Sequence, residues 1–272
     1  MQIPHRKVYI SKTEANILLN DKLAGCGEKR IIRFTRNSLL VFLYDMERYS
    51  LIHIKMPREF VLLQGTGCRW KHCTFCDYHT DTSLQPFEVN RPVLEQVTGR
   101  YGMLDVINSG SAMELDEDTV AMIADIVRKK AIHTLWFEAH YMYRNRLSDF
   151  SARFEPAVVK FRCGVESFEP TLRNRWNKGI SSDVTPQEIA RYFQGVCLLC
   201  CTEGDSRERI LNDIEIARQH FEYFSVNVFC HNTTFVRRDE TLVHWFVKEV
   251  YPHIKDLPGI EVLVDNTDLG VG

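Results

Sequence analysis

Three features that mark common classes of protein are missing from this sequence of 272 residues. No apolar run approaches the ~20 residues that a membrane-spanning helix needs, and the first residues do not have the pattern of a secretory signal. The net charge is −2, so no general excess of positive charge attracts nucleic acid. There is no low-complexity tract and no short tandem repeat. We therefore expect a soluble globular protein with no membrane partner and no nucleic-acid partner.

The cysteines do not have the pattern of a disulfide framework. They number nine, an odd count, and two of them, Cys200 and Cys201, are neighbours. Secreted domains that depend on disulfides are usually much shorter and carry an even number of cysteines. The cysteines therefore indicate free thiols in the reducing environment of the cytoplasm.

Three of the cysteines gather in one loop after a strand-like run. Cys68, Cys73 and Cys76 lie within nine positions, and three thiolates so close are better interpreted as ligands of one metal centre. A zinc ion is possible with His79 as the fourth ligand. A plant-type 2Fe–2S cluster shares the spacing but needs a fourth cysteine, and the next one downstream is Cys163. A 4Fe–4S cluster with one iron left open is the third alternative.

Strand-like runs alternate with helix-like segments from residue 59 to the end of the chain. This alternation predicts an α/β protein with a parallel sheet and helices on its outside. Residues 1–58 differ, because one helix-like segment is followed there by three short apolar runs. We expect them to form an N-terminal extension of one helix and a small β-meander. In parallel sheets of this kind ligands bind at the carboxyl ends of the strands, so the residues after each strand are the site candidates.

Small and polar residues follow two of the expected strands. Ser109-Gly-Ser111 follows the second strand, where small residues allow close approach of the backbone and hydroxyl oxygens suit an ammonium group. Trp136, Glu138 and His140 share one face of the third strand because side chains alternate along it. If that face looks inward, a carboxylate and an imidazole reach the substrate cavity. A hydrogen-bonded histidine in the core is the alternative.

The cysteine loop resembles that of the radical S-adenosylmethionine (SAM) superfamily. The usual pattern there is Cys-x3-Cys-x-aromatic-Cys. The pair Cys73 and Cys76 matches its second half, whereas the first gap is one residue longer here. A second resemblance lies further along the chain, where Gly-Val-Glu-Ser167 precedes Asn-Lys-Gly179. Together these motifs imply a partial (β/α)6 barrel over residues 59–272.

The resemblance also implies the cofactors. Cys68, Cys73 and Cys76 would hold a 4Fe–4S cluster, and the amino and carboxylate groups of SAM would bind its open iron. SAM itself would be contacted by Phe75, Tyr78, Ser109, Gly110, Ser111, Glu166 and Ser167. Once reduced by a one-electron donor such as flavodoxin or ferredoxin, the cluster would cleave SAM to a 5′-deoxyadenosyl radical that abstracts hydrogen from the substrate.

Within this superfamily the chain resembles enzymes that act on 7-deazaguanines, and among them the queuine lyases of bacterial queuosine salvage. This implies a small heterocyclic substrate, queuine, which loses its cyclopentenediol from the side-chain nitrogen to give 7-aminomethyl-7-deazaguanine. A carboxylate can accept the N1–H and the exocyclic amine of a deazaguanine together. The candidates for substrate contact are Glu138, His140, Asn227, Asn232 and Asp265, of which Glu138 and His140 are also the catalytic candidates.

Two other classes of function stay open at this point. One is a different radical SAM reaction on a small metabolite, a peptide or a tRNA. The other is a non-catalytic zinc protein that uses the three loop cysteines and His79, which leaves the Gly-Val-Glu-Ser167 motif without an explanation.

The metal separates these classes. After anaerobic reconstitution with iron and sulfide, we expect a brown protein with the absorbance of an iron–sulfur cluster. A colourless protein that retains zinc would contradict the interpretation of the cysteine loop.

Overall fold

The computed structural model of the protein describes residues 34–35, 38–39 and 46–271. The chain divides into two compact units, residues 1–46 and 47–272. In the first unit, β1 (Phe34–Thr35) pairs antiparallel with β2 (Ser38–Leu39). The expected helix at the start of the chain lies outside the described residues, so the organisation of the N-terminal extension stays a prediction.

The second unit is built on one eight-stranded sheet with the strand order β10-β9-β8-β7-β6-β5-β4-β3. The strands are β3 (Tyr49–Ile52), β4 (Arg58–Leu63), β5 (Met103–Asn108), β6 (Thr134–Glu138), β7 (Val158–Glu166), β8 (Gly195–Cys200), β9 (Tyr223–Val228) and β10 (Ile260–Leu263). All neighbours from β4 to β10 are parallel, and β3 is antiparallel to β4. The predicted parallel sheet is therefore confirmed.

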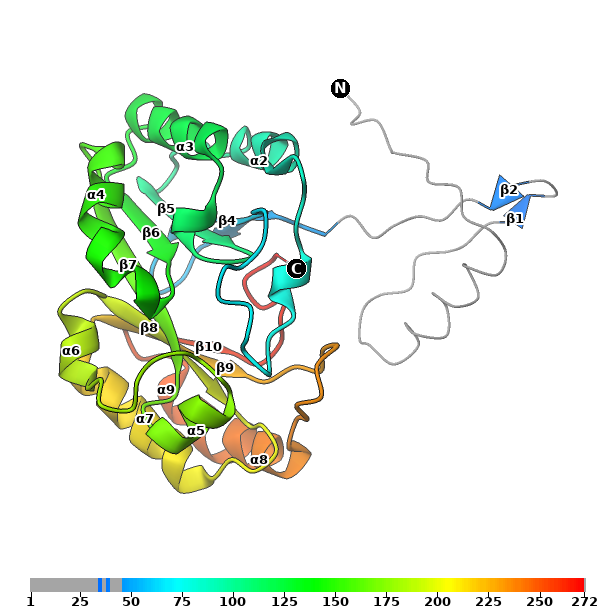
Figure 1. Cartoon of the computed structure of the whole chain (residues 1–272), viewed down its shortest axis with the longest axis vertical. Helices are drawn as coiled ribbons and strands as arrows, with labels where there is room; N and C mark the ends of the chain where they lie inside the picture. The colour runs from blue at the N-terminus through cyan, green and yellow to red at the C-terminus, as the bar shows by residue number, and fades with distance from the viewer. Residues whose placement is uncertain (1–33, 36–37, 40–45, 272) are drawn as a thin grey trace. The chain divides into compact units, whose positions relative to one another are not determined.

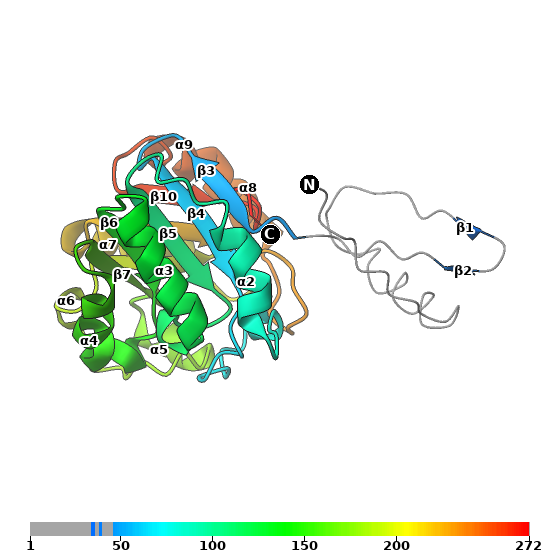
Figure 2. The ribbon, with the colours of Figure 1, turned by 90° about the horizontal axis from the view of Figure 1, so that it is seen from above.

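Helices fill the crossovers between the parallel strands and lie outside the curved sheet (Figures 1 and 2). They are α2 (Pro86–Leu94), α3 (Glu117–Lys129), α4 (Leu147–Ser151), α5 (Pro170–Arg175), α6 (Pro186–Ala190), α7 (Arg207–His220), α8 (Glu240–Trp245) and α9 (Tyr251–Ile254). None of the helices in the described part is long and apolar enough to cross a membrane. The sheet and its outer helices form the partial barrel that the sequence predicts.

The first helix of the barrel differs in extent from its prediction. The sequence favours a helix over residues 90–101, whereas α2 ends at Leu94. The backbone N–H groups of Thr98 and Gly99 donate instead to the buried carboxylate of Glu59, each at 2.7 Å. These bonds to a strand residue replace the bonds that would continue the helix.

The two faces of the sheet are chemically different. Along β7, Phe161, Cys163 and Val165 belong to the apolar core between the sheet and the helices. Arg162 and Gly164 alternate with them and face the inside of the barrel, because side chains alternate along a strand. The outer face thus supplies the packing energy, and the inner face is left for polar groups.

A buried layer of charge crosses the inside of the barrel. Arg58 Nε donates to Asp105 Oδ2 at 2.8 Å, and Arg58 Nη2 donates to Glu261 Oε2 at 2.8 Å. Arg162 pairs with the other oxygen of Asp105, and the hydroxyl of Tyr223 donates to Glu261. All five side chains are nearly inaccessible to solvent, so each charge depends on its partners.

Strand β3 lies before the predicted domain boundary at residue 58 but belongs to the main sheet. Its four residues are registered with β4, with Tyr49 opposite Val61 and Ile52 opposite Arg58. The tyrosine hydroxyl also donates to Glu59 at 2.8 Å. The compact barrel unit therefore begins at Glu47, because this edge strand is part of the main sheet.

We expect Asp105→Asn to lower the free energy of unfolding by about 3–5 kcal/mol, because it leaves buried guanidinium charge without its partner. Asp125→Asn is the matched control, since Asp125 pairs with Lys129 on the exposed surface of α3 at 2.7 Å. That change is expected to cost no more than about 0.5 kcal/mol. Denaturant unfolding of both variants measures the difference, and equal losses would show that the charge layer does not stabilise the barrel.

Candidate active site

The cysteine loop, residues 65–78, is fastened to residues 176–179 of the loop after α5. The indole Nε1 of Trp70 donates to the backbone carbonyl of Asn177 at 2.9 Å. Gly179 has φ +70°, and a Cβ there would lie 2.2 Å from the Trp70 ring. Only glycine leaves room for this ring, so Trp70 packs the cysteine loop against residues 176–179.

The three loop thiols have the chemistry that an iron–sulfur cluster needs. Cys68, Cys73 and Cys76 are half-buried and free, and Lys71 donates its backbone N–H to Cys68 Sγ at 3.4 Å. Burial raises the pKa of Cys73 and raises that of Cys76 to about 12, so ligation would release protons. Within residues 46–271, no three Cys, His, Asp or Glu side chains converge as ligands of one ion do. A cluster binds each thiolate through a different iron, so it fits thiols that stand apart.

None of the other described cysteines competes for this role. Cys163, Cys197, Cys200 and Cys201 are buried among strands. Cys230 is half-buried, and its thiol lies 3.6–3.7 Å from backbone carbonyls at the ends of β9 and β10. The donor set on the loop is therefore three thiols, which fits a cluster with one iron open to a ligand.

The loop after β5 lies directly against the cysteine loop. The hydroxyl of Ser109 accepts the backbone N–H of Gly65 at 3.1 Å. A Cβ on Gly110 would lie 3.2 Å from Cys68 Cα and 2.1 Å from a carboxylate oxygen of Glu114. The backbone N–H of Ser111 donates to the same carboxylate at 2.8 Å. The small residues thus let the two loops approach closely, and the contact of Ser109, Gly110 and Ser111 with SAM stays a prediction.

Three charged side chains meet at Gly164 on the inner face of the barrel. Glu166, which ends β7 at φ +65°, accepts a hydrogen bond from Lys178 Nζ at 2.8 Å. A Cβ on Gly164 would lie 2.8 Å from Glu166 Oε1, 3.1 Å from Lys178 Nζ and 3.4 Å from Glu138 Oε1. Burial acts to lower the pKa of Lys178, but Glu166 and Cys73 outweigh it and raise that pKa. Glycine at position 164 thus makes room for two carboxylates and one ammonium.

Glu138 is the carboxylate of this group that no described residue neutralises directly. Its oxygens have no hydrogen bond or ion pair within the described part, whereas Glu166 has Lys178. Burial raises the pKa of Glu138, and Glu166 adds to the rise, while Arg162 and Lys178 oppose it. A desolvated carboxylate without a partner is suited to bind a hydrogen-bond donor or a cation.

His140 lies beside this group, and both of its ring nitrogens have hydrogen-bond partners in the protein. Its Nε2 lies 2.7 Å from the carbonyl of Lys178, and its Nδ1 accepts the backbone N–H of Met142 at 3.2 Å. The ring also stacks on Trp70, with centroids 5.3 Å apart. Burial and Lys178 lower the pKa of His140 to about 4. Both ring nitrogens of His140 are therefore occupied by the protein, and the catalytic and substrate-binding roles expected of it stay predictions.

The three remaining substrate candidates differ in the hydrogen bonds that their side chains already form. Asn227 on β9 has a buried Oδ1 without a partner among the described residues. Asn232 uses its amide to hold the chain, because Nδ2 donates to the carbonyl of Phe75 at 2.7 Å and Oδ1 accepts from Thr234. Asp265 is exposed and accepts from Thr267 within its own turn. Asn227 therefore offers a buried polar atom that a ligand could satisfy.

The two aromatic residues of the cysteine loop lie in different surroundings. Phe75 is buried and meets Trp176 edge to face, with ring centroids 5.6 Å apart. Lys178 Nζ lies 5.6 Å from the centre of the Phe75 ring. Tyr78 is largely exposed, and its hydroxyl lies 3.5 Å from Asn266 Oδ1. Phe75 is therefore packed inside the protein beside Lys178, whereas Tyr78 lies at the surface.

Ser167 lies inside the protein and serves the loop that follows Glu166. Its side chain is fully buried, and its hydroxyl accepts the backbone N–H of Glu169 at 3.0 Å. The next backbone N–H, that of Phe168, donates to Asp213 on α7 at 3.0 Å. These bonds fix the turn that presents the carboxylate of Glu166.

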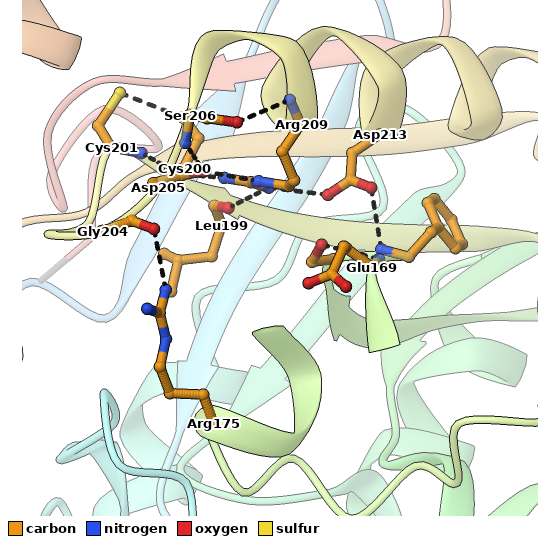
Figure 3. Close-up of polar contacts among 12 residues, drawn as sticks. Glu169, Arg175, Leu199, Cys200, Cys201, Gly204, Asp205, Ser206, Arg209 and Asp213 are labelled. Atoms are coloured by element: carbon orange, nitrogen blue, oxygen red, sulfur yellow. Dashed lines mark hydrogen bonds and ion pairs between the residues drawn. The ribbon is translucent and has the colours of Figure 1, made fainter. Parts of the chain in front are cut away.

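Arg209 fixes the neighbouring loop after β8 (Figure 3). It donates to Asp213 at 2.7 Å and, through Nε, to Asp205 at 2.7 Å. Asp205 in turn accepts the backbone N–H of Cys201, which has φ +64°. Cys200 and Cys201 have sulfurs 3.7 Å apart and are both buried, in keeping with the buried thiols expected there. One arginine thus holds the turns that end β7 and β8.

Sequence reasoning did not find the partners that organise the site. Lys178 stands in the Asn-Lys-Gly motif, but its pairing with Glu166 needs the fold to bring together positions twelve apart. The stacking of Trp70 on His140 joins positions far apart in the chain and leaves no local signal. The sequence did contain one signal, Gly164 of the Gly-Val-Glu-Ser motif, because a glycine there lets the side chains of Glu138, Glu166 and Lys178 approach the backbone.

The lowered pKa of His140 predicts a pH dependence of stability. Between about pH 6.5 and 4 the unfolded chain binds a proton at this ring and the folded protein does not, so the stabilisation is lost as the pH falls. The loss is at most about 3 kcal/mol. His140→Gln keeps a donor for the carbonyl of Lys178 but does not titrate. Urea unfolding from pH 7 to 4 should show a smaller loss in the variant, and identical losses would contradict a buried neutral imidazole.

Comparison with known proteins places this geometry in a family. Neither a scan of protein-family models nor a search of curated proteins found a match. Among solved structures, the chain is similar to the queuine lyase from Clostridium spiroforme bound to SAM and queuine. The identity is 38%, the match covers 84% of this chain and 100% of that chain, and the TM-score is 0.80. The likeness confirms the predicted fold and the prediction of an enzyme, against the alternative of a non-catalytic zinc protein. The chain belongs to the queuine lyase family of radical SAM enzymes.

Proposed function

We propose that this protein is a queuine lyase, which cleaves the bond between the side-chain nitrogen and the cyclopentenediol of queuine and leaves 7-aminomethyl-7-deazaguanine. The observation that carries the proposal is the likeness to a solved queuine lyase, whose chain is matched over its whole length at 38% identity. The strand-end site supports it, because it combines three free thiols with a half-buried carboxylate that has no partner among the described residues.

Cys68, Cys73 and Cys76 are the proposed ligands of a 4Fe–4S cluster. With SAM bound at the open iron, the cluster supplies a carbon-centred radical able to take hydrogen from an unactivated carbon. The contribution of the protein is to hold the reactants and to exclude water. The fastening of the cysteine loop to residues 176–179 through Trp70 serves this purpose, because it fixes the loop to the wall of the cavity.

The proposed SAM site is formed by the loops after β4, β5 and β7. Ser109 and Ser111 each accept one backbone hydrogen bond, and a hydroxyl oxygen keeps a second lone pair for an ammonium donor. Gly110 allows the backbone to come close. Glu166 shares one oxygen with Lys178, and its other oxygen can accept a ribose hydroxyl. Phe75 and Tyr78 would contact the adenine, and Ser167 would act through the turn that it fixes.

The proposed substrate contacts are Glu138 and Asn227. Both point inward from β6 and β9, and both have polar atoms without partners in the described part of the chain. A carboxylate can accept two neighbouring N–H groups of a deazaguanine edge, and an amide oxygen can accept a third. His140 and Asn232 would act from behind this layer, since their polar atoms are taken by the protein. Asp265, which is exposed, would act from the rim of the site.

The catalytic role that remains for a protein side chain falls to Glu138. It would bind the heterocycle and hold the scissile side chain in a fixed place, which is the contribution of a positioned acceptor in a water-poor site. Burial raises the pKa of Glu138, so its carboxylate gains most when a bound substrate supplies hydrogen-bond donors.

The direct test is anaerobic turnover. Reconstituted protein is supplied with a reductant, SAM and queuine, and the products are separated and identified by mass spectrometry. We expect 5′-deoxyadenosine and 7-aminomethyl-7-deazaguanine to form together, at matching rates. A Cys73→Ala variant serves as the cluster-deficient control and should form neither. Formation of 5′-deoxyadenosine while queuine stays intact would contradict the proposed substrate.

The role of Glu138 is tested by Glu138→Gln, which keeps the shape and removes the charge. A charged hydrogen-bonding group contributes about 1.5–3 kcal/mol, so we expect kcat/KM for queuine to fall by about 10- to 100-fold. Glu203→Gln is the matched control, because Glu203 is exposed in the loop after β8. SAM binding should be unchanged in both variants. Equal kcat/KM values in the two variants would remove Glu138 from the substrate site.

A further inference from the structure

An open hollow of about 480 Å³ lies beside the first cysteine of the loop. Its wall includes Cys68 itself, Glu114 and Tyr143, together with the cations Arg69, Lys71 and Arg146. The three cations are exposed. We name these three residues the cationic face. It comes from two separate segments, the cysteine loop and the turn before α4, so it is formed by the fold and not by a run of basic sequence.

The three cations of this face outnumber the one carboxylate of the hollow, Glu114. Within residues 46–271, none of the three cations forms an ion pair with a carboxylate. The acid in the hollow, Glu114, is occupied by Tyr143 and by the backbone N–H groups of Arg69 and Ser111. Exposed charges of one sign that lack partners create a local potential, although the net charge of the chain is −2.

The backbone that carries the face takes part in the contacts of the cysteine loop. Arg69 and Arg146 both act on the hydroxyl of Tyr143, where their charges oppose the rise in pKa that burial and Glu114 cause. Arg146 also lies over the Tyr143 ring, 5.7 Å from its centroid. Lys71 has φ +38° in the turn that donates to Cys68 Sγ. The three cations therefore lie around the hollow beside Cys68, at one edge of the proposed cluster.

We propose that the cationic face is the docking surface of an acidic one-electron carrier protein, which delivers its electron at the Cys68 edge. This inference rests on the proposed function, because it assumes a redox cluster behind the loop. Charge complementarity selects an acidic partner, and closeness to a metal ligand makes an electron carrier the useful one. A nucleic acid fits less well, because it calls for a longer basic track than three cations round a small hollow.

The test compares two double variants of the reconstituted protein with equal change in charge. Arg69→Glu with Arg146→Glu reverses the face. Arg128→Glu with Arg218→Glu reverses two cations in the last turns of α3 and α7. These helix ends lie away from the carboxyl ends of the strands. Cluster reduction is followed anaerobically by stopped-flow absorbance, with reduced flavodoxin and separately with reduced methyl viologen, a small cationic reductant.

We expect the rate constant with flavodoxin to fall about tenfold or more in the face variant, and to stay within about twofold in the control. Reduction by methyl viologen should not slow in either variant. Calorimetric titration with oxidised flavodoxin should show weaker binding in the face variant alone. Equal flavodoxin rates in both variants, a loss with both reductants, or weakened binding of tRNA in place of flavodoxin would overturn the inference. Queuine takes no part, so failure of queuine turnover tests the proposed function separately.

Discussion

The site depends on the ion pair between Lys178 and Glu166. It joins the end of β7 to residues 176–179, and that segment is the meeting point of the other loops. The carbonyl of Lys178 binds His140 from the end of β6, and the carbonyl of Asn177 binds Trp70 of the cysteine loop. An ion pair in such an enclosed place costs desolvation and is retained where it fixes a geometry. Here it fixes the cysteine loop, the expected ribose carboxylate and the wall of the cavity to one another.

The inside of the barrel thus has two polar levels with different roles. The deeper level joins Arg58, Asp105, Arg162 and Glu261 in a layer where each charge has a partner, so it closes the barrel and stabilises it. The level at the strand ends has one carboxylate more than its cations can pair, and that carboxylate is Glu138. A group left unpaired in an enclosed space is unfavourable for the free protein. It becomes favourable when a ligand brings the matching donors, which is the basis of the substrate contact proposed above.

The sequence predicts the fold well because its signals are local. Strand and helix patterns along the chain give the parallel sheet, and helix starts such as Asp116 before α3 are marked by their capping residue. The cysteine loop and the Gly-Val-Glu-Ser motif are likewise local, so the family could be recognised. The roles of side chains are harder to predict than the fold. The alternation along a strand places His140 and Glu138 on one face, but it does not show which of their polar atoms will be hydrogen-bonded to backbone groups. Two carbonyls, those of Lys178 and Phe75, take His140 and Asn232 out of the cavity, and both belong to segments far away in the chain. Asn227 Oδ1 and the carboxylate of Glu138 stay open because no segment of the described part of the chain reaches them.

The central claim is that these loops direct a radical at the side chain of a bound deazaguanine. Queuine deuterated throughout its side chain tests this most directly, in a single anaerobic turnover with unlabelled SAM and mass analysis of the 5′-deoxyadenosine. The account predicts that 5′-deoxyadenosine gains one mass unit as labelled queuine is consumed. Unlabelled 5′-deoxyadenosine formed at the same rate as the product would show that hydrogen comes from elsewhere, and would contradict the account.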